Sequence, residues 1–149
     1  MTLKFYSEER RRFPELFNRD LTVEECIKIF NELCDSYDEK LTKLEFHGWN
    51  TSGGQCVIWK RNDAFSNTTI RLPNKSNMGC LLHEFAHVMQ LRNEGKTGHN
   101  KGLMEWIEIL DEYAQLREYW GIENLNPVMG VDLNDDNAVI AAVIGGKNE

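Results

Sequence analysis

The amino-acid sequence predicts an α+β domain, and three observations carry this prediction. Apolar residues recur every three or four positions in three segments, which indicates helices. The three segments are residues 22–37, about 77–92 and about 102–119. Three short runs between the first two helices have strand-like composition and are bounded by turn residues. These runs are residues 43–49, 55–61 and 68–72. A length of 149 residues fits one domain, so we assign residues 1–149 to a single α+β unit.

The first predicted helix has a clear start and one apolar face. Thr22 and Glu25 have the spacing of a capping box, in which each side chain binds the other residue's backbone N–H. The stripe that we expect to be buried consists of Val23, Ile27, Phe30 and Leu33. Cys26 and Cys34 fall on the same face, so we expect them to be small core residues.

The remaining elements follow from local signals. The T-S-G-G segment at 51–54 predicts a turn after the first strand, and Pro73 ends the third strand. Ser76 is a candidate N-cap for the helix at 77–92. We expect the three strands to form one small sheet packed on that helix. The core spans about 22–118, and a C-terminal extension begins at about residue 121, in which "AVIAAVI" fits a short helix or strand.

Composition narrows the class of protein. A net charge of −7 argues against a broad nucleic-acid surface, and Arg10-Arg11-Arg12 between acidic residues predicts a solvated face. The N-terminus has no apolar signal-peptide core, and the chain lacks the run of about 18 apolar residues that a membrane span needs. None of the four cysteines form a C-x-x-C pair, which argues against a cysteine zinc ribbon. We expect an intracellular, cytoplasmic monomer with reduced thiols.

The segment "CLLHEFAHVMQ" at 80–90 contains the main chemical signal. His83 and His87 are four positions apart on a helix, so they lie one turn apart on one face and can bind one ion. Glu84 lies about 100° round the helix, where it can hold a water rather than the metal. Paired helical histidines also occur without a metal. Here, however, the helix is apolar, and polar groups in a core need partners.

A catalytic zinc usually has a third protein ligand and an open position. His99, which an eleven-residue gap separates from His87, is the candidate that the sequence favours, because Gly95 and Gly98 let the loop fold back over the metal helix. Glu105 and Glu108 on the last helix are the alternatives, and His47 is expected on a strand surface. The spacing excludes the metzincin pattern, in which the third histidine follows sooner.

Two segments together resemble the SprT-like (Spartan-type) zinc metalloprotease domain, a zincin of the H-E-x-x-H type. They are H-E-F-A-H at 83–87 and G-H-N-K-G-L at 98–103, and the resemblance covers roughly residues 22–118. Asn100 and Leu103 depart from the family pattern, which usually has Gly and Phe, and no C-terminal zinc ribbon follows. The resemblance implies a minimal zincin-like fold, Zn²⁺ held by His83, His87 and His99, and Glu84 as general base.

These residues and the resemblance predict a zinc-dependent metallopeptidase that acts on a protein or peptide. Members of the family cleave proteins crosslinked to DNA, so the resemblance implies nucleic acid as a further partner, which the acidic charge disfavours. The alternatives are a non-catalytic zinc-binding protein of the same fold, acting through protein or nucleic-acid interaction, and a module that docks on DNA.

Two roles stay open from the sequence. The oxyanion formed during hydrolysis needs a hydrogen-bond donor, for which Tyr113, Tyr119 and His47 are candidates. The ligand histidines need acceptors for their second ring N–H groups. The candidates for that role on the last helix are Glu108, Asp111 and Glu112.

Overall fold

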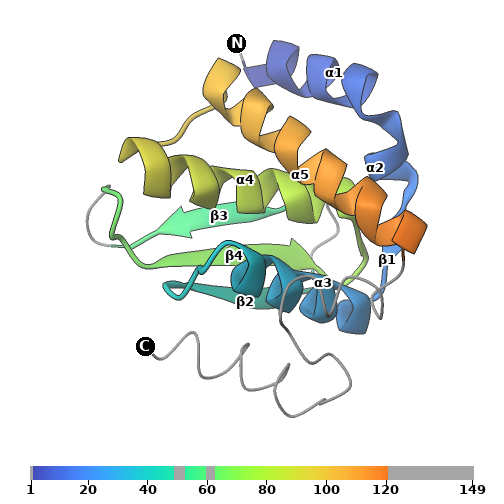
Figure 1. Cartoon of the computed structure of the whole chain (residues 1–149), viewed down its shortest axis with the longest axis horizontal. Helices are drawn as coiled ribbons and strands as arrows, with labels where there is room; N and C mark the ends of the chain where they lie inside the picture. The colour runs from blue at the N-terminus through green and yellow to red at the C-terminus, as the bar shows by residue number, and fades with distance from the viewer. Residues whose placement is uncertain (1, 49–52, 60–62, 121–149) are drawn as a thin grey trace.

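The predicted α+β class is confirmed in the computed structural model, which describes residues 2–48, 53–59 and 63–120 (Figure 1). These residues form five helices and two small sheets. The helices are α1 (Thr2–Arg12), α2 (Pro14–Asn18), α3 (Val23–Ser36), α4 (Met78–Glu94) and α5 (Lys101–Trp120). The strands are β1 (Asp20–Leu21), β2 (Thr42–His47), β3 (Gln55–Ile58), β4 (Thr68–Pro73) and β5 (Ser76–Asn77). The C-terminal extension, with "AVIAAVI", lies outside the described residues.

The larger sheet contains the three predicted strands in the order β2-β4-β3. The central strand β4 is parallel to β2 and antiparallel to β3. The segment that contains T-S-G-G therefore joins two strands that are not neighbours, although residues 51 and 52 lie outside the described part. The strands β1 and β5 form a separate antiparallel pair, in which Leu21 lies opposite Ser76.

Helix α3 confirms the predicted cap and corrects the predicted face. The Thr22 hydroxyl accepts from the Glu25 N–H at 3.1 Å, and the Thr22 N–H donates to the Glu25 carboxylate at 2.9 Å. Of the predicted stripe, Phe30 and Leu33 are buried, whereas Val23 and Ile27 are only half-buried. The helix is rotated so that another set faces the core. That set is Cys26, Ile29, Phe30, Leu33 and Cys34.

Helix α4 lies between the larger sheet and α5, with α3 against the same core (Figure 1). Its Phe85 packs edge-on against Phe30 of α3, with ring centroids 6.2 Å apart. The N-cap is Asn77, whose side chain accepts from the Cys80 N–H at 2.8 Å, so the prediction of Ser76 as N-cap is wrong. Ser76 instead pairs with Leu21 in the small sheet. Gly95, with φ of 79°, ends the helix in the left-handed region and starts the loop toward His99.

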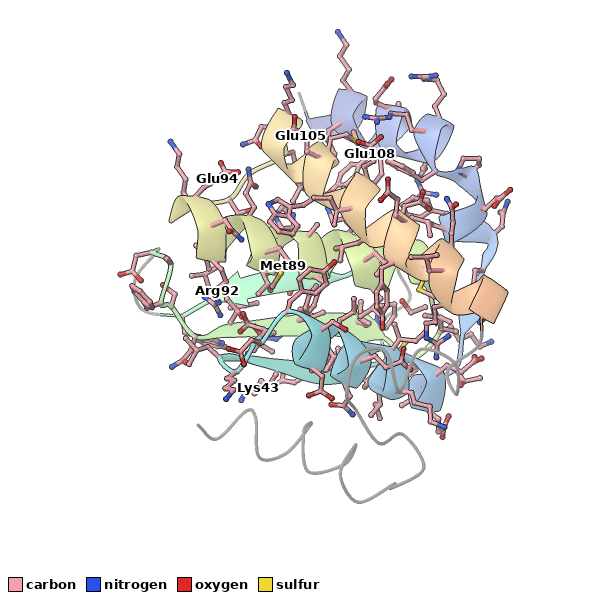
Figure 2. The ribbon with its side chains drawn as sticks, viewed as in Figure 1. Lys43, Met89, Arg92, Glu94, Glu105 and Glu108 are labelled. Atoms are coloured by element: carbon pink, nitrogen blue, oxygen red, sulfur yellow. The ribbon has the colours of Figure 1, made fainter. Side chains whose placement is uncertain are left out.

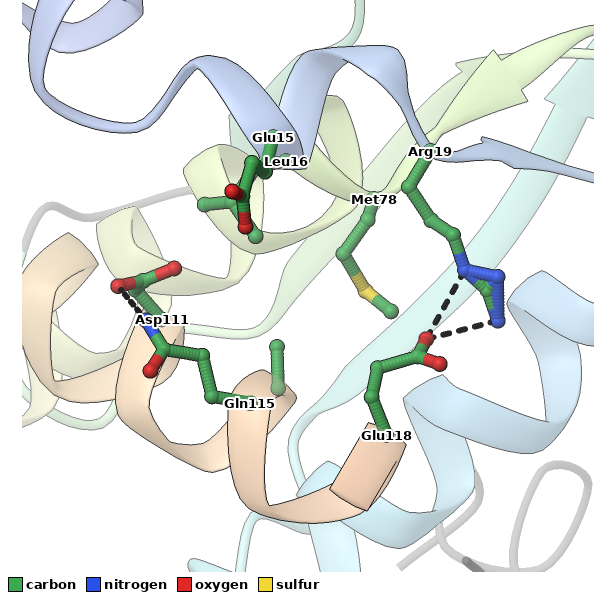
Figure 3. A pocket seen from close by; sticks show the side chains of 8 residues that line it. Glu15, Leu16, Arg19, Met78, Asp111, Gln115 and Glu118 are labelled. Carbon is green, nitrogen blue, oxygen red and sulfur yellow. Dashed lines mark hydrogen bonds and ion pairs between the residues drawn. The ribbon is translucent and has the colours of Figure 1, made fainter.

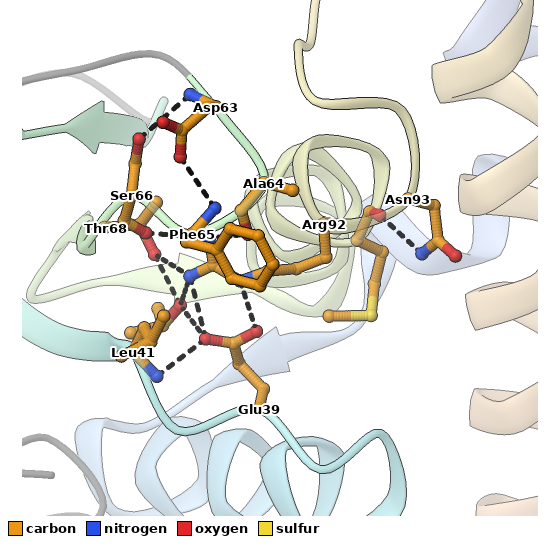
Figure 4. A network of polar contacts seen from close by, with 11 residues as sticks. Glu39, Leu41, Asp63, Ala64, Phe65, Ser66, Thr68, Arg92 and Asn93 are labelled. Carbon is orange, nitrogen blue, oxygen red and sulfur yellow. Dashed lines mark hydrogen bonds and ion pairs between the residues drawn. The ribbon is translucent and has the colours of Figure 1, made fainter.

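A buried polar network fixes the C-terminal half of α4 to the sheet (Figure 4). The guanidinium of Arg92 donates to the two carboxylate oxygens of Glu39 at 2.8 and 2.9 Å. It also donates to the carbonyl oxygens of Ala64 and Ser66. A paired charge with its donors satisfied can be buried, so this network holds α4 in register with the strands.

Helices α1 and α2 were not predicted from the sequence. They add Phe5 and Leu16 to the core, and Phe13 between them adds a further ring, so the core extends N-terminally of residue 22. Most of α1 is exposed and polar, so its sequence has too few apolar residues to show a clear stripe. Arg10, Arg11 and Arg12 are exposed, as predicted. No helix within the described ranges is long and apolar enough to cross a membrane.

Candidate metal centre

Three histidines meet on one side of α4. His83 and His87 lie one helical turn apart, with ring centroids 5.0 Å from each other. The loop after Gly95 returns His99 to the same place, 5.3 Å from His83 and 5.1 Å from His87 between ring centroids. One ligand atom from each ring lies within 4.8 Å of the other two. The three predicted ligands are therefore together, and they could hold a metal ion.

Helix α1 fixes the tautomer of His83. The Glu9 carboxylate lies 2.8 Å from Nδ1 of His83, and both side chains are buried. A carboxylate only accepts hydrogen bonds, so Nδ1 carries the proton. Nε2 of His83 is then left with its lone pair for a metal, in the carboxylate–histidine arrangement common at metal sites.

A chain of hydrogen bonds fixes the tautomer of His87. The Gly98 N–H donates to Oε1 of Gln90, which identifies that atom as the oxygen. The Thr97 hydroxyl also donates to this oxygen, at 2.8 Å. Because its one proton is used there, Thr97 must accept from Nδ1–H of His87, which is 2.8 Å away. Nε2 of His87 is left as the ligand atom.

The spacing of one pair of nitrogens fits a tetrahedral ion. Nε2 of His83 and Nε2 of His99 are 3.3 Å apart. Two ligand nitrogens at 2.0–2.1 Å from one tetrahedral zinc are separated by about 3.3–3.4 Å. The donor atoms, the tautomers of His83 and His87 and this distance all agree with a bound metal.

Burial sets the protonation of the histidines. Burial, together with the charges of His83 and His99, lowers the pKa of His87 to about 3, so this ring is neutral at physiological pH. Burial also lowers the pKa of His99, and the charge of His83 adds to the effect. Burial acts in the same direction on His83, but the hydrogen bond and charge of Glu9 outweigh it and raise its pKa. The ligand nitrogen must be unprotonated, so an ion would displace the second proton, on Nε2 of His83, while Nδ1 keeps its proton toward Glu9.

Glu84 lies beside the three rings as a buried carboxylate, only 7% exposed. No described residue donates a hydrogen bond to it. Burial raises its pKa to about 7, while the His83 charge opposes the rise and the Glu9 charge adds to it. Gly54 leaves room for this side chain, because a Cβ at position 54 would lie 3.1 Å from Cγ of Glu84. The carboxylate is therefore held next to the three histidines without belonging to the cluster that could hold a metal.

The histidines and Glu84 line an open cavity of about 560 Å³. Part of its wall is the edge strand β3, through Gln55, Cys56 and Val57. Tyr6 of α1 and Thr97 complete the lining with Gly54. The site is thus built from four parts of the chain, namely α1, the segment of β3, α4 and the loop after α4.

A second cavity, of about 420 Å³, lies between α2 and α5 (Figure 3). Leu16, Met78 and Ala114 form its apolar part, and Arg19 pairs with Glu118 at 2.9 Å. No histidine is among its described lining residues, so it has no imidazole ligand for a metal and no carboxylate beside such a ligand. The chemistry of the described residues is concentrated in the histidine cavity.

The alternatives for the third ligand lie elsewhere. Glu105 and Glu108 are exposed on the part of α5 beside α1 (Figure 2). Glu108 pairs with Arg12 at 3.2 Å. His47 is half-buried at the end of β2, 3.6 Å from Glu45. Among the described residues, the cluster that could hold a metal contains His83, His87 and His99.

The supporting residues differ from those considered in the sequence. The acceptors for His83 and His87 are Glu9 and Thr97, so none of Glu108, Asp111 or Glu112 supplies them. Tyr113 donates to Glu32 at 3.0 Å and does not line the cavity. The side chain of Tyr119 lies outside the described residues. The sequence contains one weak signal for Glu9. Phe5 and Glu9 are four positions apart, which places them on one face of a helix.

Comparison of the chain with protein-family models, characterised proteins and solved structures found no match. The resemblance to the SprT-like domain therefore stays a prediction from two motif segments. The function is argued below from the geometry of the site itself.

Proposed function

We propose that the protein is a zinc-dependent metallopeptidase of the H-E-x-x-H zincin type, similar to SprT-like domains. One observation carries the proposal. Three imidazoles, two of them with fixed tautomers, converge beside Glu84, a buried carboxylate without a hydrogen-bond partner among the described residues. A purely structural metal site has no use for such a base.

The donor set supports zinc as the metal. Three histidines with an open fourth position are typical of catalytic zinc, although imidazole also binds copper, nickel and iron. When bound, zinc acts as a Lewis acid on a carbonyl oxygen and lowers the pKa of a water. His83, His87 and His99 would hold the ion.

Glu84 would act as the general base and then as the general acid. It takes one proton from the water whose oxygen bonds to the scissile carbonyl carbon. It then delivers that proton to the leaving nitrogen as the C–N bond breaks. The products are a carboxylic acid and an amine. A carboxyl group that is shielded from water, as Glu84 is, suits both steps.

The cavity wall supports a peptide as the substrate. Among the described strands β3 pairs only with β4, so its other edge has backbone groups open for pairing. Three residues of β3 line the cavity with the histidines. An extended chain can add to such an edge through main-chain hydrogen bonds, independently of its sequence. A protein or peptide in extended form would pass directly over Glu84.

The test is a comparison of the parent with Glu84→Gln, with exposed Glu105→Gln as the matched control. We expect about one zinc per chain in all three proteins, since Glu84 is not a ligand. A loosely folded protein should be cleaved by the parent and the control and spared when a chelator is present. Glu84→Gln should cleave about 10²–10⁴-fold more slowly.

DNA is added in a parallel series, because the resemblance implies an activating role for it. Equal cleavage by the parent and Glu84→Gln would remove Glu84 from the mechanism. Full zinc content without cleavage under any of these conditions would favour the non-catalytic zinc-binding protein.

A further inference from the structure

Tyr6 of α1 stands at the open side of the histidine cluster. Its hydroxyl oxygen is 3.3 Å from Nε2 of His99. Its ring centroid lies 5.5 Å from that of His83 and 5.0 Å from that of His99. The residue is 37% exposed, and it lines the same cavity as Glu84. The phenol is therefore next to the reacting groups and accessible to a ligand.

Two neighbours hold Tyr6 in this position. Phe5 is buried with its ring centroid 5.2 Å from that of His99 and 5.9 Å from that of His83. Glu9, three residues after Tyr6, binds His83 from the same helix. Residues three and four apart share one face of a helix, so these contacts turn Tyr6 toward the cavity. The placement of the hydroxyl is built into the packing of α1.

The hydroxyl has a free role once the site is in use. The Nε2 lone pair of His99, its neighbour at 3.3 Å, is then committed to the metal. Among the described residues, the other hydroxyl that lines the cavity is that of Thr97, which already donates to Gln90. The Tyr6 O–H is left to donate to an oxygen that gains negative charge in the cavity. Such a donor stabilises the tetrahedral transition state of acyl transfer.

We propose that Tyr6 is a catalytic residue whose phenolic O–H donates a hydrogen bond to the oxygen of the scissile carbonyl as that oxygen becomes negative. This inference rests on the proposed peptidase function. It assigns the donor role for which the sequence suggested Tyr113, Tyr119 or His47. It also makes α1 part of the catalytic apparatus rather than a cover for it.

The experiment measures binding as well as rate. The parent, Tyr6→Phe and Tyr113→Phe are loaded with zinc, and their metal content is measured. Calorimetry then measures the affinity of each protein for a peptide phosphonate, which mimics the tetrahedral state. The affinity for the corresponding peptide is measured in proteins that also carry Glu84→Gln, so that the peptide is not cleaved. We expect Tyr6→Phe to keep its zinc and its peptide affinity. Its phosphonate affinity and its kcat should both fall by about 10²–10³-fold. Tyr113→Phe should match the parent, because Tyr113 does not line the cavity.

Each other outcome overturns a defined statement. Equal phosphonate affinity in the parent and Tyr6→Phe would overturn the role of Tyr6 and leave the peptidase proposal standing. Loss of zinc in Tyr6→Phe would show that Tyr6 holds the metal, which also overturns the donor role. A zinc-loaded parent that neither cleaves protein nor binds the phosphonate would overturn both proposals.

Discussion

Helices α4 and α1 both place side chains at the histidine centre, but they are built in opposite ways. Thirteen of the 17 residues of α4 are buried, because the sheet, α3 and α5 surround it. Among the described side chains of α1, only those of Phe5 and Glu9 are buried. One turn of a polar helix thus supplies the acceptor for His83 and the hydroxyl near His99. A segment can place side chains at a site while contributing little to the core.

The largest effect should come from the ligands on α4 and its loop. His83→Ala or His87→Ala should lose tight zinc binding, and His99→Ala should weaken it strongly. Each loss should exceed the 10–100-fold typical of a lost supporting residue. Zinc affinity measured by competition with a chelator gives the comparison. Glu105→Ala and Glu108→Ala are the controls, and an unchanged affinity in His99→Ala with loss in either control would refute His99 as the ligand.

The ion pairs of the two helices should differ in their worth for stability. Arg92→Met keeps the apolar stem but leaves Glu39 buried and unpaired, so it should lower the free energy of unfolding by about 3–5 kcal/mol. Arg12→Met removes the exposed partner of Glu108 and should cost about 0–1 kcal/mol. Denaturant unfolding monitored by circular dichroism measures both. If both substitutions lower the free energy of unfolding equally, the exposed ion pair of α1 contributes as much stability as the ion pair of α4.

The contribution of α1 to the metal site is tested by Glu9→Gln. The amide has nearly the same shape but lacks the charge that orients and polarises His83, so zinc affinity should fall by about 10–100-fold. Glu8→Gln, at a half-exposed residue of the same helix that pairs with Arg11, should bind zinc like the parent. If the two variants bind zinc equally well, the Glu9–His83 contact does not support the site.

A further effect is expected where β3 meets α4. A Cβ at position 54 would lie 2.8 Å from Leu72 Cδ2 and 3.0 Å from the Arg71 carbonyl oxygen, besides crowding Glu84. Gly54→Ala should therefore shift β3, cost about 1–3 kcal/mol of stability and slow cleavage without loss of zinc. Gly53→Ala meets nothing within 4 Å and is the matched control. If both variants cleave at the parental rate, the cavity wall at Gly54 can accommodate the added methyl group.

The sequence by itself determined the features that depend on short stretches of chain. The capping box of Thr22 and Glu25 and the pairing of His83 with His87 follow from helix periodicity, which a few residues establish. The three main strands could be predicted because their composition and turn residues are local. The loop with Gly95 and Gly98 indicated His99, although Glu105 and Glu108 could not be excluded before the fold was known.

Only the tertiary structure decided which distant segments meet. Glu9 and His83 are separated by 74 positions, and Tyr6 and His99 by 93, so no periodicity connects them. The insertion of β4 between β2 and β3, and the rotation of α3 that buries Ile29 instead of Ile27, also depend on packing. The physical reason is the same in each case. Which residues become buried depends on every element that packs against them. The position of a polar helix such as α1 therefore follows from its tertiary contacts and not from its own sequence pattern.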